Sequence, residues 1–306
     1  MTTIATAQET GRGVAFGLTA YVMWGCFPLF FALFQGVPAF EILLHRVIWS
    51  CLFLVGLVTL LGRWSPIRRA LAEPRRLGRV LGCALLIALN WGLYIYSVET
   101  RHVLQASLGY FMTPLVNVGL GMLVLRERMA RLQGVAVALA VLAIAIQLVM
   151  LGELPWISLV LAFSFGTYGL LRKQVPLDGL SGLFVETLLL LPLALMALGW
   201  LAQAELSHFL DDGRTTSLLV ASGVITALPL LAFAGAARRL RLATLGFLMY
   251  LNPTIQFVIA LLVFHEPLAV PQLVTFVLIW IGLALYSWSA WQSRPREARV
   301  STASSR

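Results

Sequence analysis

The sequence predicts an all-α integral membrane protein of ten transmembrane helices, arranged as two inverted five-helix repeats. Of the 306 residues, 60% are hydrophobic and only 11% are charged, whereas a soluble domain has about 25% charged residues. The mean hydropathy of +0.90 agrees. Ten apolar runs have the length that crosses a bilayer. One of them, which contains a proline, returns in the second half of the chain, and such self-similarity indicates duplication.

The ten predicted spans are continuous apolar runs separated by short connections that carry Gly, Pro or charge. Short connections predict that successive helices are antiparallel neighbours. The spans are 13–34, 39–61, 77–98, 103–125, 133–151, 155–171, 179–201, 215–236, 242–264 and 270–290. The chain accordingly divides into an N-terminal tail (1–12), a first repeat (13–151), a second repeat (152–290) and a C-terminal tail (291–306).

The positive charges predict the orientation. Of the 22 Lys and Arg residues, 19 fall in the tails and in connections on one side of the predicted membrane, and only Arg101 and Arg214 fall on the other. The remaining one, Arg46, lies inside a span. Because Lys and Arg accumulate in cytoplasmic connections, both termini are predicted to be cytoplasmic, in a cell inner membrane.

The repeat is clearest in Leu108–Glu127 and Leu245–Glu266. Pro114 matches Pro253 at an offset of 139, and the same offset matches Glu127 with Glu266. Upstream of the proline the two copies differ by a two-residue slip. Five spans per repeat is an odd number, so the second copy enters the membrane inverted, as in many transporter folds. The alternative is a chance match between two leucine-rich helices.

The two prolines of the repeat are predicted hinges. Proline cannot donate a backbone hydrogen bond, and its ring displaces the carbonyl four residues earlier, here those of Tyr110 and Met249. A freed carbonyl must be satisfied by protein or a wet cavity. The alternative is an ordinary packing kink. The neighbouring amides favour a substrate path lined by Asn117, Asn252 and Gln256.

Ionisable residues inside the spans are candidates for function, because they are costly in a bilayer. Arg46 lies in the 39–61 span, and Glu186 lies at an equivalent place in the 179–201 span. We expect both to face the interior, paired directly or through water, either on the substrate path or as structural glue. Glu186, and with less support His45, is the candidate proton-coupling group. Glu41 is interpreted as a solvated helix end.

Aromatic and amide side chains at mid-depth complete the predicted path. Tyr and Trp usually gather at the membrane interfaces, but several lie by count near the middle of a span. An aromatic, amide-lined cavity suits amphipathic organic solutes better than bare ions. The candidates of this kind are Trp24, Asn90, Trp91, Tyr110, Tyr168 and Tyr250.

Other classes of function are disfavoured. The net charge of +9 is spread over connections and forms no basic face, which argues against nucleic acid. The three cysteines lie in apolar spans without metal-ligand spacing, and no catalytic motif is present. We therefore expect no metal, cofactor or catalytic residue. The expected partners are a small-molecule substrate and membrane lipid, and the expected state is a monomer.

The chain resembles the drug/metabolite transporter superfamily, and within it the EamA-like RarD family. The matching stretches are 21–28, 41–50, 109–118 with 125–128, 185–187 with Pro192, and 250–254 with His265 and Glu266. The likeness extends over about 13–290. It implies ten helices in two inverted halves around a central path, lined chiefly by the third, fourth, eighth and ninth spans. Relatives of this kind export amino acids, aromatic ones included, and related metabolites.

The resulting hypothesis is an inner-membrane exporter of small amphipathic metabolites, amino acids above all, working by alternating access through a central cavity. The alternatives are a membrane-embedded enzyme or a flippase acting on lipid-linked substrates. An enzyme would need clustered carboxylates at one membrane face, and the isolated Asp211–Asp212 pair fits poorly.

Overall fold

A computed structural model describes residues 2–125, 131–172, 174–237, 239–240 and 248–303. All regular elements in these ranges are helices. This follows from the composition, because a helix satisfies its backbone polar groups internally in lipid. The helices are α1 (Thr2–Gly25), α2 (Phe27–Phe31), α3 (Ala39–Leu60), α4 (Trp64–Leu71), α5 (Pro74–Glu99), α6 (Val103–Leu125), α7 (Arg131–Leu151), α8 (Trp156–Arg172), α9 (Gly179–Gln203), α10 (Gly213–Ala237), α12 (Leu251–Leu262) and α13 (Val270–Ala303).

The protein is a multi-pass membrane protein. In the described residues, six helical segments are long and apolar enough to cross a bilayer: Glu9–Phe31, Ala39–Leu60, Arg76–Glu99, Gly179–Gln203, Gly213–Phe233 and Val270–Trp288. Shorter apolar helices are Gly134–Met150, Trp156–Arg172 and Leu251–Leu262. Long apolar helices therefore occur where the sequence predicts spans.

The helices depart from the predicted spans in three places. The region predicted as an N-terminal tail is helical from Thr2, and the first span breaks at Cys26 because Pro28 starts the separate helix α2. The predicted connection 62–76 contains α4, whose Ile67 is buried while its arginines stay outside. Of the predicted span 242–264, residues 242–247 lie outside the described residues.

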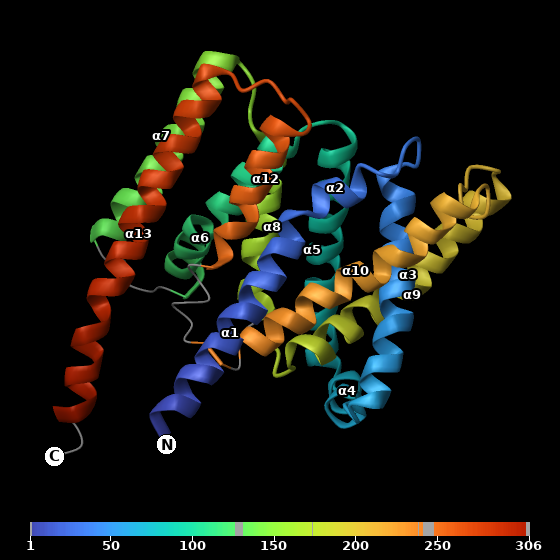
Figure 1. The fold of residues 1–306 in the computed structure, drawn as a ribbon, viewed down its shortest axis with the longest axis horizontal. Coiled ribbons are helices and arrows are strands. Elements are labelled where there is room, and N and C mark those ends of the chain that lie inside the picture. The colour runs from blue at the N-terminus through green and yellow to red at the C-terminus, as the bar shows by residue number, and fades with distance from the viewer. Residues whose placement is uncertain (1, 126–130, 173, 238, 241–247, 304–306) are drawn as a thin grey trace.

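Helices distant in sequence pack together (Figure 1). α7 lies along α13 at one edge of the molecule, while α3 crosses α9 and α10 toward the opposite edge. Between them, α6 packs on α8 and α12, α5 packs on α8, and α1 packs on α10. The start of α1 and the last turns of α13 lie at the same end of the molecule as α4.

Small residues allow the closest helix crossings. A Cβ atom on Gly223 of α10 would overlap the backbone of Trp49 and Ser50 on α3. A Cβ atom on Gly109 of α6 would lie 2.8 Å from the carbonyl oxygen of Ser158 on α8. Membrane helices approach in this way because small residues let their backbones come close. These two crossings fix the depth at which α3 and α6 present their polar residues.

Carboxylates cap helix starts at the end of the molecule opposite α4. Glu99 accepts a hydrogen bond of 3.0 Å from the backbone N–H of Ala39, at the start of α3. Glu266 accepts two, of 2.7 Å from Val103 and 2.8 Å from Leu104, at the start of α6. Each carboxylate satisfies N–H groups that have no partner within the helix. Burial raises the pKa of Glu266, and these two hydrogen bonds oppose the shift.

Candidate functional site

Arg46 lies on α3 and is buried, with 3% of its surface exposed. Its Nε donates a hydrogen bond of 2.8 Å to the hydroxyl of Thr226 on α10. Its guanidinium carbon lies 4.1 Å from the ring centre of Trp91 on α5, and 5.6 and 5.5 Å from the rings of Phe27 and Phe31. Aromatic faces attract a guanidinium in this geometry. Three aromatic rings and one hydroxyl therefore surround the cation.

Asn90, next to Trp91 on α5, ties three helices together. Its amide nitrogen donates to the carbonyl of Leu161, at 3.1 Å, and to the hydroxyl of Ser164, at 3.0 Å, both on α8. Its amide oxygen accepts a bond of 3.2 Å from the hydroxyl of Tyr110 on α6. A buried amide with all of these bonds satisfied fixes the relative positions of α5, α6 and α8.

A run of aromatic contacts continues from Tyr110 toward α9. The ring of Phe165 lies 6.1 Å from Tyr110 and 5.9 Å from Tyr168, centre to centre. The hydroxyl of Tyr168 donates to the carboxylate of Glu186, at 3.3 Å to the nearer oxygen. Arg172, one turn after Tyr168 on α8, places its Nε 3.5 Å from the same carboxylate. The carboxylate of Glu186 is therefore buried but paired, with 1% of its surface exposed.

Six predicted site residues thus form one connected set, which we call the buried series. Most of them are joined by direct contacts or by adjacency in a helix, and Phe165 joins Tyr110 to Tyr168. They come from α3, α5, α6, α8 and α9. The buried series consists of Arg46, Trp91, Asn90, Tyr110, Tyr168 and Glu186.

The direct pairing considered for Arg46 and Glu186 is wrong. Glu186 pairs with Arg172, and Arg46 bonds to Thr226. The physical reason is depth. Arg46 is eight residues into a helix that starts at one end of the molecule, and Glu186 is eight residues into α9, which starts near the other. Both side chains nevertheless face the interior, as expected.

The other predicted path residues are not part of the buried series. Trp24 packs on Tyr21 and Phe233, with ring centres 5.5 and 5.9 Å away. On α12 the amide of Gln256 donates a bond of 2.8 Å to Asn252. Tyr250 is half-buried just before α12, and Asn117 is exposed on α6.

The predicted hinge prolines lie on helices that contact each other. Pro114 is buried within α6, and Pro253 is buried in the first turn of α12. The hydroxyl of Ser107 on α6 donates a bond of 2.8 Å to the carbonyl of Pro253. Of the matched residues Glu127 and Glu266, the structure describes only Glu266, because Glu127 lies outside the described residues.

Glu41 is not a solvated helix end; that interpretation is wrong. It is 1% exposed, because the connection between α9 and α10 covers it. One carboxylate oxygen accepts bonds from the hydroxyl of Ser207 and the backbone N–H of His208, and the other lies 2.7 Å from His208 Nδ1. In the same region His45 is buried, 4.7 Å from the ring of Phe209, and its Nδ1 accepts a bond of 3.1 Å from Trp49.

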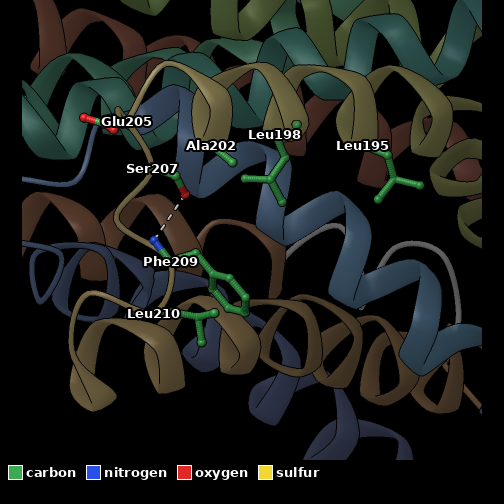
Figure 2. A pocket seen from close by; sticks show the side chains of 8 residues that line it. Leu195, Leu198, Ala202, Glu205, Ser207, Phe209 and Leu210 are labelled. Carbon is green, nitrogen blue, oxygen red and sulfur yellow. Dashed lines mark hydrogen bonds between the residues drawn. The ribbon is translucent and has the colours of Figure 1, made fainter.

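A cavity of about 400 Å³ lies away from the buried series (Figure 2). It lies between α9 and the following connection, and its lining includes Leu195 and Leu198 of α9 and Phe209 and Leu210 of the connection. Its lining is mostly apolar, and Leu195 and Leu210 are exposed. No residue predicted for the substrate path lines this cavity. The candidate site is instead the buried series, where six of the predicted residues are connected.

Sequence reasoning missed three participants. Thr226 is one of many hydroxyl residues in the spans, and Arg172 was counted only as a positive charge at the end of a span. Tyr94, on the same helix as Trp91, has a buried hydroxyl without a partner. Its ring lies 6.0 Å from Phe31 and 5.8 Å from Tyr110. A signal existed only for Arg172, four residues after Tyr168, which is the spacing of one helix face.

No cluster of three or more His, Cys, Asp or Glu side chains that could hold a metal ion occurs in the part of the chain that the structure describes. The polar groups of the buried series are an arginine, a carboxylate, two phenols, an amide and an indole. Such a set offers both charges and several hydrogen-bond donors and acceptors between aromatic faces. It can bind and orient an amphipathic solute.

Comparisons with known proteins show which family this chain is similar to. Residues 11–149 match the model of the EamA-like transporter family. An uncharacterized transporter of Pseudomonas aeruginosa is 49% identical over 93% of this chain and 96% of its own. Protein RarD of Escherichia coli K12 is 42% identical over 96% of this chain and 99% of its own. The chloramphenicol-sensitive protein RarD of Pseudomonas aeruginosa is 33% identical over 95% and 98%.

One solved crystal structure has the same fold, with a TM-score of 0.57 at 17% identity, covering 90% of this chain and 96% of its own. At that identity the likeness concerns the fold alone. The sequence relatives carry the assignment, since each covers nearly the whole chain at 33% identity or more. The chain therefore belongs to the EamA-like transporter family of the drug/metabolite transporter superfamily, among relatives named RarD.

Proposed function

We propose that this protein exports small amphipathic metabolites, chiefly amino acids with aromatic ones included, across the cell inner membrane by alternating access. The observation that carries the proposal is the buried series, in which Arg46, Asn90 and Glu186 lie among aromatic rings inside a member of a transporter family. Ionisable and amide groups are retained inside a membrane protein where a solute or ion passes. The protein is not an enzyme in this proposal and works as a monomer surrounded by lipid.

The proposed architecture is ten helices in two inverted repeats, 13–151 and 152–290. Helix packing supports it. The repeat equates α3 with α9, α6 with α12 and α7 with α13, and each of these equivalent pairs packs together, as expected across a two-fold axis. It also equates α5 with α10 and α8 with the first span. The packing of α5 on α8 then corresponds to that of α1 on α10, and both are present.

The environments of Arg46 and Glu186 also support the repeat. At an offset of 140, Arg46 of α3 corresponds to Glu186 of α9. Arg46 contacts the end of the first span through Phe27 and Phe31, while Glu186 contacts the end of α8 through Tyr168 and Arg172. Two equivalent positions thus contact equivalent spans with opposite charges.

Alternating access is proposed to use Pro114 and Pro253 as hinges between the repeats. Both prolines are buried, one on α6 and one on α12, the two helices that the repeat relates and that pack on each other. If Pro114→Ala and Pro253→Ala variants transported at the wild-type rate, the hinge role would be rejected.

If transport is coupled to protons, Glu186 is the proposed coupling group, with His45 second. Glu186 is buried and hydrogen-bonded to Tyr168, so a change in its protonation would alter a contact between α8 and α9. The test is flux into liposomes under an imposed pH gradient. A Glu186→Gln variant that retained the full pH dependence would exclude this role.

The proposed orientation has both termini and α4 in the cytoplasm. The start of α1, the last turns of α13 and the arginines of α4 lie at one end of the molecule, as the positive-inside rule requires. Cysteine labelling of intact cells at position 205, in the connection after α9, checks it. Labelling by a membrane-impermeant reagent is expected there and not at position 65, in α4.

The function is tested with purified protein in liposomes. Vesicles loaded with L-phenylalanine, L-tryptophan, L-leucine or L-lysine are diluted into radiolabelled solute, and exchange is followed. We expect exchange of the first three above that of empty vesicles, and little for lysine, whose second positive charge would be repelled by the buried Arg46. No exchange with any of these amino acids would reject the proposed substrate class.

A further inference from the structure

The guanidinium of Arg46 lacks an anionic partner. Among the described residues, the ion pairs are Arg12 with Glu9, Arg76 with Glu73, Arg172 with Glu186, His208 with Glu41 and Arg239 with Glu9. Arg46 is in none of them. Its Nη1 atom is buried and has no hydrogen-bond partner in the part of the chain that the structure describes. Arg46 therefore differs from Arg172, which lies in the same interior and has both a carboxylate and backbone carbonyls.

Such a cation is costly to keep. Removing a charged group from water without an opposite charge is strongly unfavourable. The bond to Thr226 and the ring of Trp91 recover part of this. These two contacts leave the Nη1 edge of the guanidinium without an acceptor among the described residues. A protein that needed only packing here would be better served by an apolar side chain of similar volume.

The surroundings orient that free edge. Trp91 covers one face of the guanidinium at 4.1 Å, and Thr226 occupies Nε at 2.8 Å. Rotation of the guanidinium is therefore restricted, and the pattern of its N–H groups is fixed. A planar fork held in this way matches the oxygens of a carboxylate or a phosphate, and of these the amino acids and organic acids of the proposed function carry a carboxylate.

A second donor lies in the same neighbourhood. The hydroxyl of Tyr94 is buried and has no partner. Its ring and the Arg46 guanidinium both contact Phe31, at 6.0 and 5.5 Å. Tyr94 of α5 and Arg46 of α3 thus lie near the same aromatic residue, Phe31. An anion beside Phe31 would be attracted by both donors, whereas an organic cation would be repelled by Arg46.

We propose that Arg46 binds the carboxylate of the transported solute, so that the protein selects organic acids and amino acids over neutral amides and organic cations. The proposal rests on the proposed function and adds a selectivity determinant to it. Tyr94 is a second donor to the same carboxylate, and Trp91 and Thr226 are positioning residues that hold the guanidinium. The solute carboxylate supplies the charge that no described residue gives Arg46.

The test uses the purified full chain and matched solutes. Thermal unfolding is followed with 3-phenylpropanoate, L-phenylalanine and L-leucine, and with the amide of each. We expect the acids to raise the melting temperature, and the amides to need at least about 10-fold higher concentration for the same rise, since a charge-assisted bond is lost. Acids and amides that act at equal concentrations would overturn the proposal. This comparison needs no variant.

The Arg46→Met variant separates ligand binding from structural support. If Arg46 binds solute, the variant without solute melts at the wild-type temperature or above, and its response to the acids weakens at least about 10-fold. If Arg46 is only structural, the variant melts lower and the acids still act at wild-type concentrations, which overturns the proposal. Should Arg46→Met fail to fold, Arg46→Lys replaces it. Lysine keeps the charge but loses the planar fork, so the acids must act only at higher concentrations than on the wild type, and action at wild-type concentrations overturns the proposal.

Flux measurements distinguish the two levels of the argument. Exchange of acids and amides at equal rates would leave the proposed transport function standing and overturn the role of Arg46. A preference for acids in thermal shifts, lost in Arg46→Met, without any flux would support the site and count against transport. Neither flux nor thermal shift with any of the six compounds would overturn both.

Discussion

The hydroxyl of Ser107 donates a hydrogen bond of 2.8 Å to the carbonyl of Pro253, 146 residues later in the chain. The bond joins α6 to α12, the two helices whose prolines the sequence pairs. Proline 253 is in the first turn of α12, so its carbonyl already accepts within the helix and uses its second lone pair here. One side-chain bond thus connects the two halves of the protein at the residue proposed as a hinge.

Replacing Ser107 with Ala is expected to lower the free energy of unfolding by about 1 kcal/mol, because one buried hydrogen bond between helices is lost. The measurement is chemical unfolding in detergent. The matched control is Ser97→Ala, since the hydroxyl of Ser97 is equally buried but donates only to Tyr94 within α5. Equal destabilisation by both changes would mean that the bond between α6 and α12 has no special weight.

A methyl group at Gly182 is expected to be harmful. A Cβ atom there would overlap the guanidinium of Arg172, which crosses α9 at this glycine. Gly182→Ala should lower the free energy of unfolding by about 1–3 kcal/mol. Gly199→Ala, on the same helix with no atom within 4 Å of the new Cβ, should raise it by about 0.5–1 kcal/mol, because alanine favours the helix. A stable Gly182→Ala protein would contradict the observed path of Arg172.

Removing Arg172 is expected to be severe, in contrast to removing Arg46. Glu186 is buried and has Arg172 as its cationic partner. Arg172→Met should therefore cost about 3–5 kcal/mol of unfolding free energy, since it leaves an uncompensated charge. The double variant Arg172→Met with Glu186→Gln should regain about 1–3 kcal/mol of this. Strictly additive losses in the double-mutant cycle would show that the two side chains do not interact.

The start of α9 provides a pH test. Asp178 accepts bonds of 3.1 Å from the backbone N–H and 2.8 Å from the hydroxyl of Ser181. Burial alone would raise the pKa of Asp178, but these bonds outweigh it and the pKa lies below 3.8. A depressed pKa stabilises the fold above pH 3.8, and this contribution disappears as the pH falls through the folded-state value. Asp178→Ala should cost about 1 kcal/mol at pH 7.

The difference in unfolding free energy between wild type and Asp178→Ala should therefore shrink as the pH is lowered toward and below 3.8. Asp178→Asn keeps an acceptor oxygen without a titrating proton, so its stability relative to Asp178→Ala should not change with pH. A constant gap between wild type and Asp178→Ala from pH 7 to pH 3 would contradict the cap.

The sequence predicts the helices well, because a bilayer leaves a long apolar run no alternative to helix. It also identifies Arg46 and Glu186, since an ionised group within such a run needs an explanation. It could not predict their partners. Whether Glu186 meets Arg46 or Arg172 depends on helix rotation and depth. These are set by close contacts, such as those of Gly223 of α10 with α3 and of Gly182 of α9 with Arg172.

Glu41 illustrates the same limit at a helix end. As a charged residue in the first turn of a predicted span, three residues after Pro38, it has the features of a solvated residue. It is buried because Ser207 and His208, from a connection 166 residues later, fold back over it. Burial imposed by a distant connection leaves no local pattern in the sequence.

Arg172 also donates to the backbone carbonyls of Val175, Leu177 and Asp178, in the connection that leads into α9. The same guanidinium therefore binds both the buried carboxylate of Glu186 and the backbone of the connection before α9. If Glu186 is neutralised, its ion pair with Arg172 is weakened. Because Arg172 also binds the connection before α9, the change reaches that connection directly. Arg172 is therefore a direct link between Glu186 and this connection, as well as the counter-ion of Glu186.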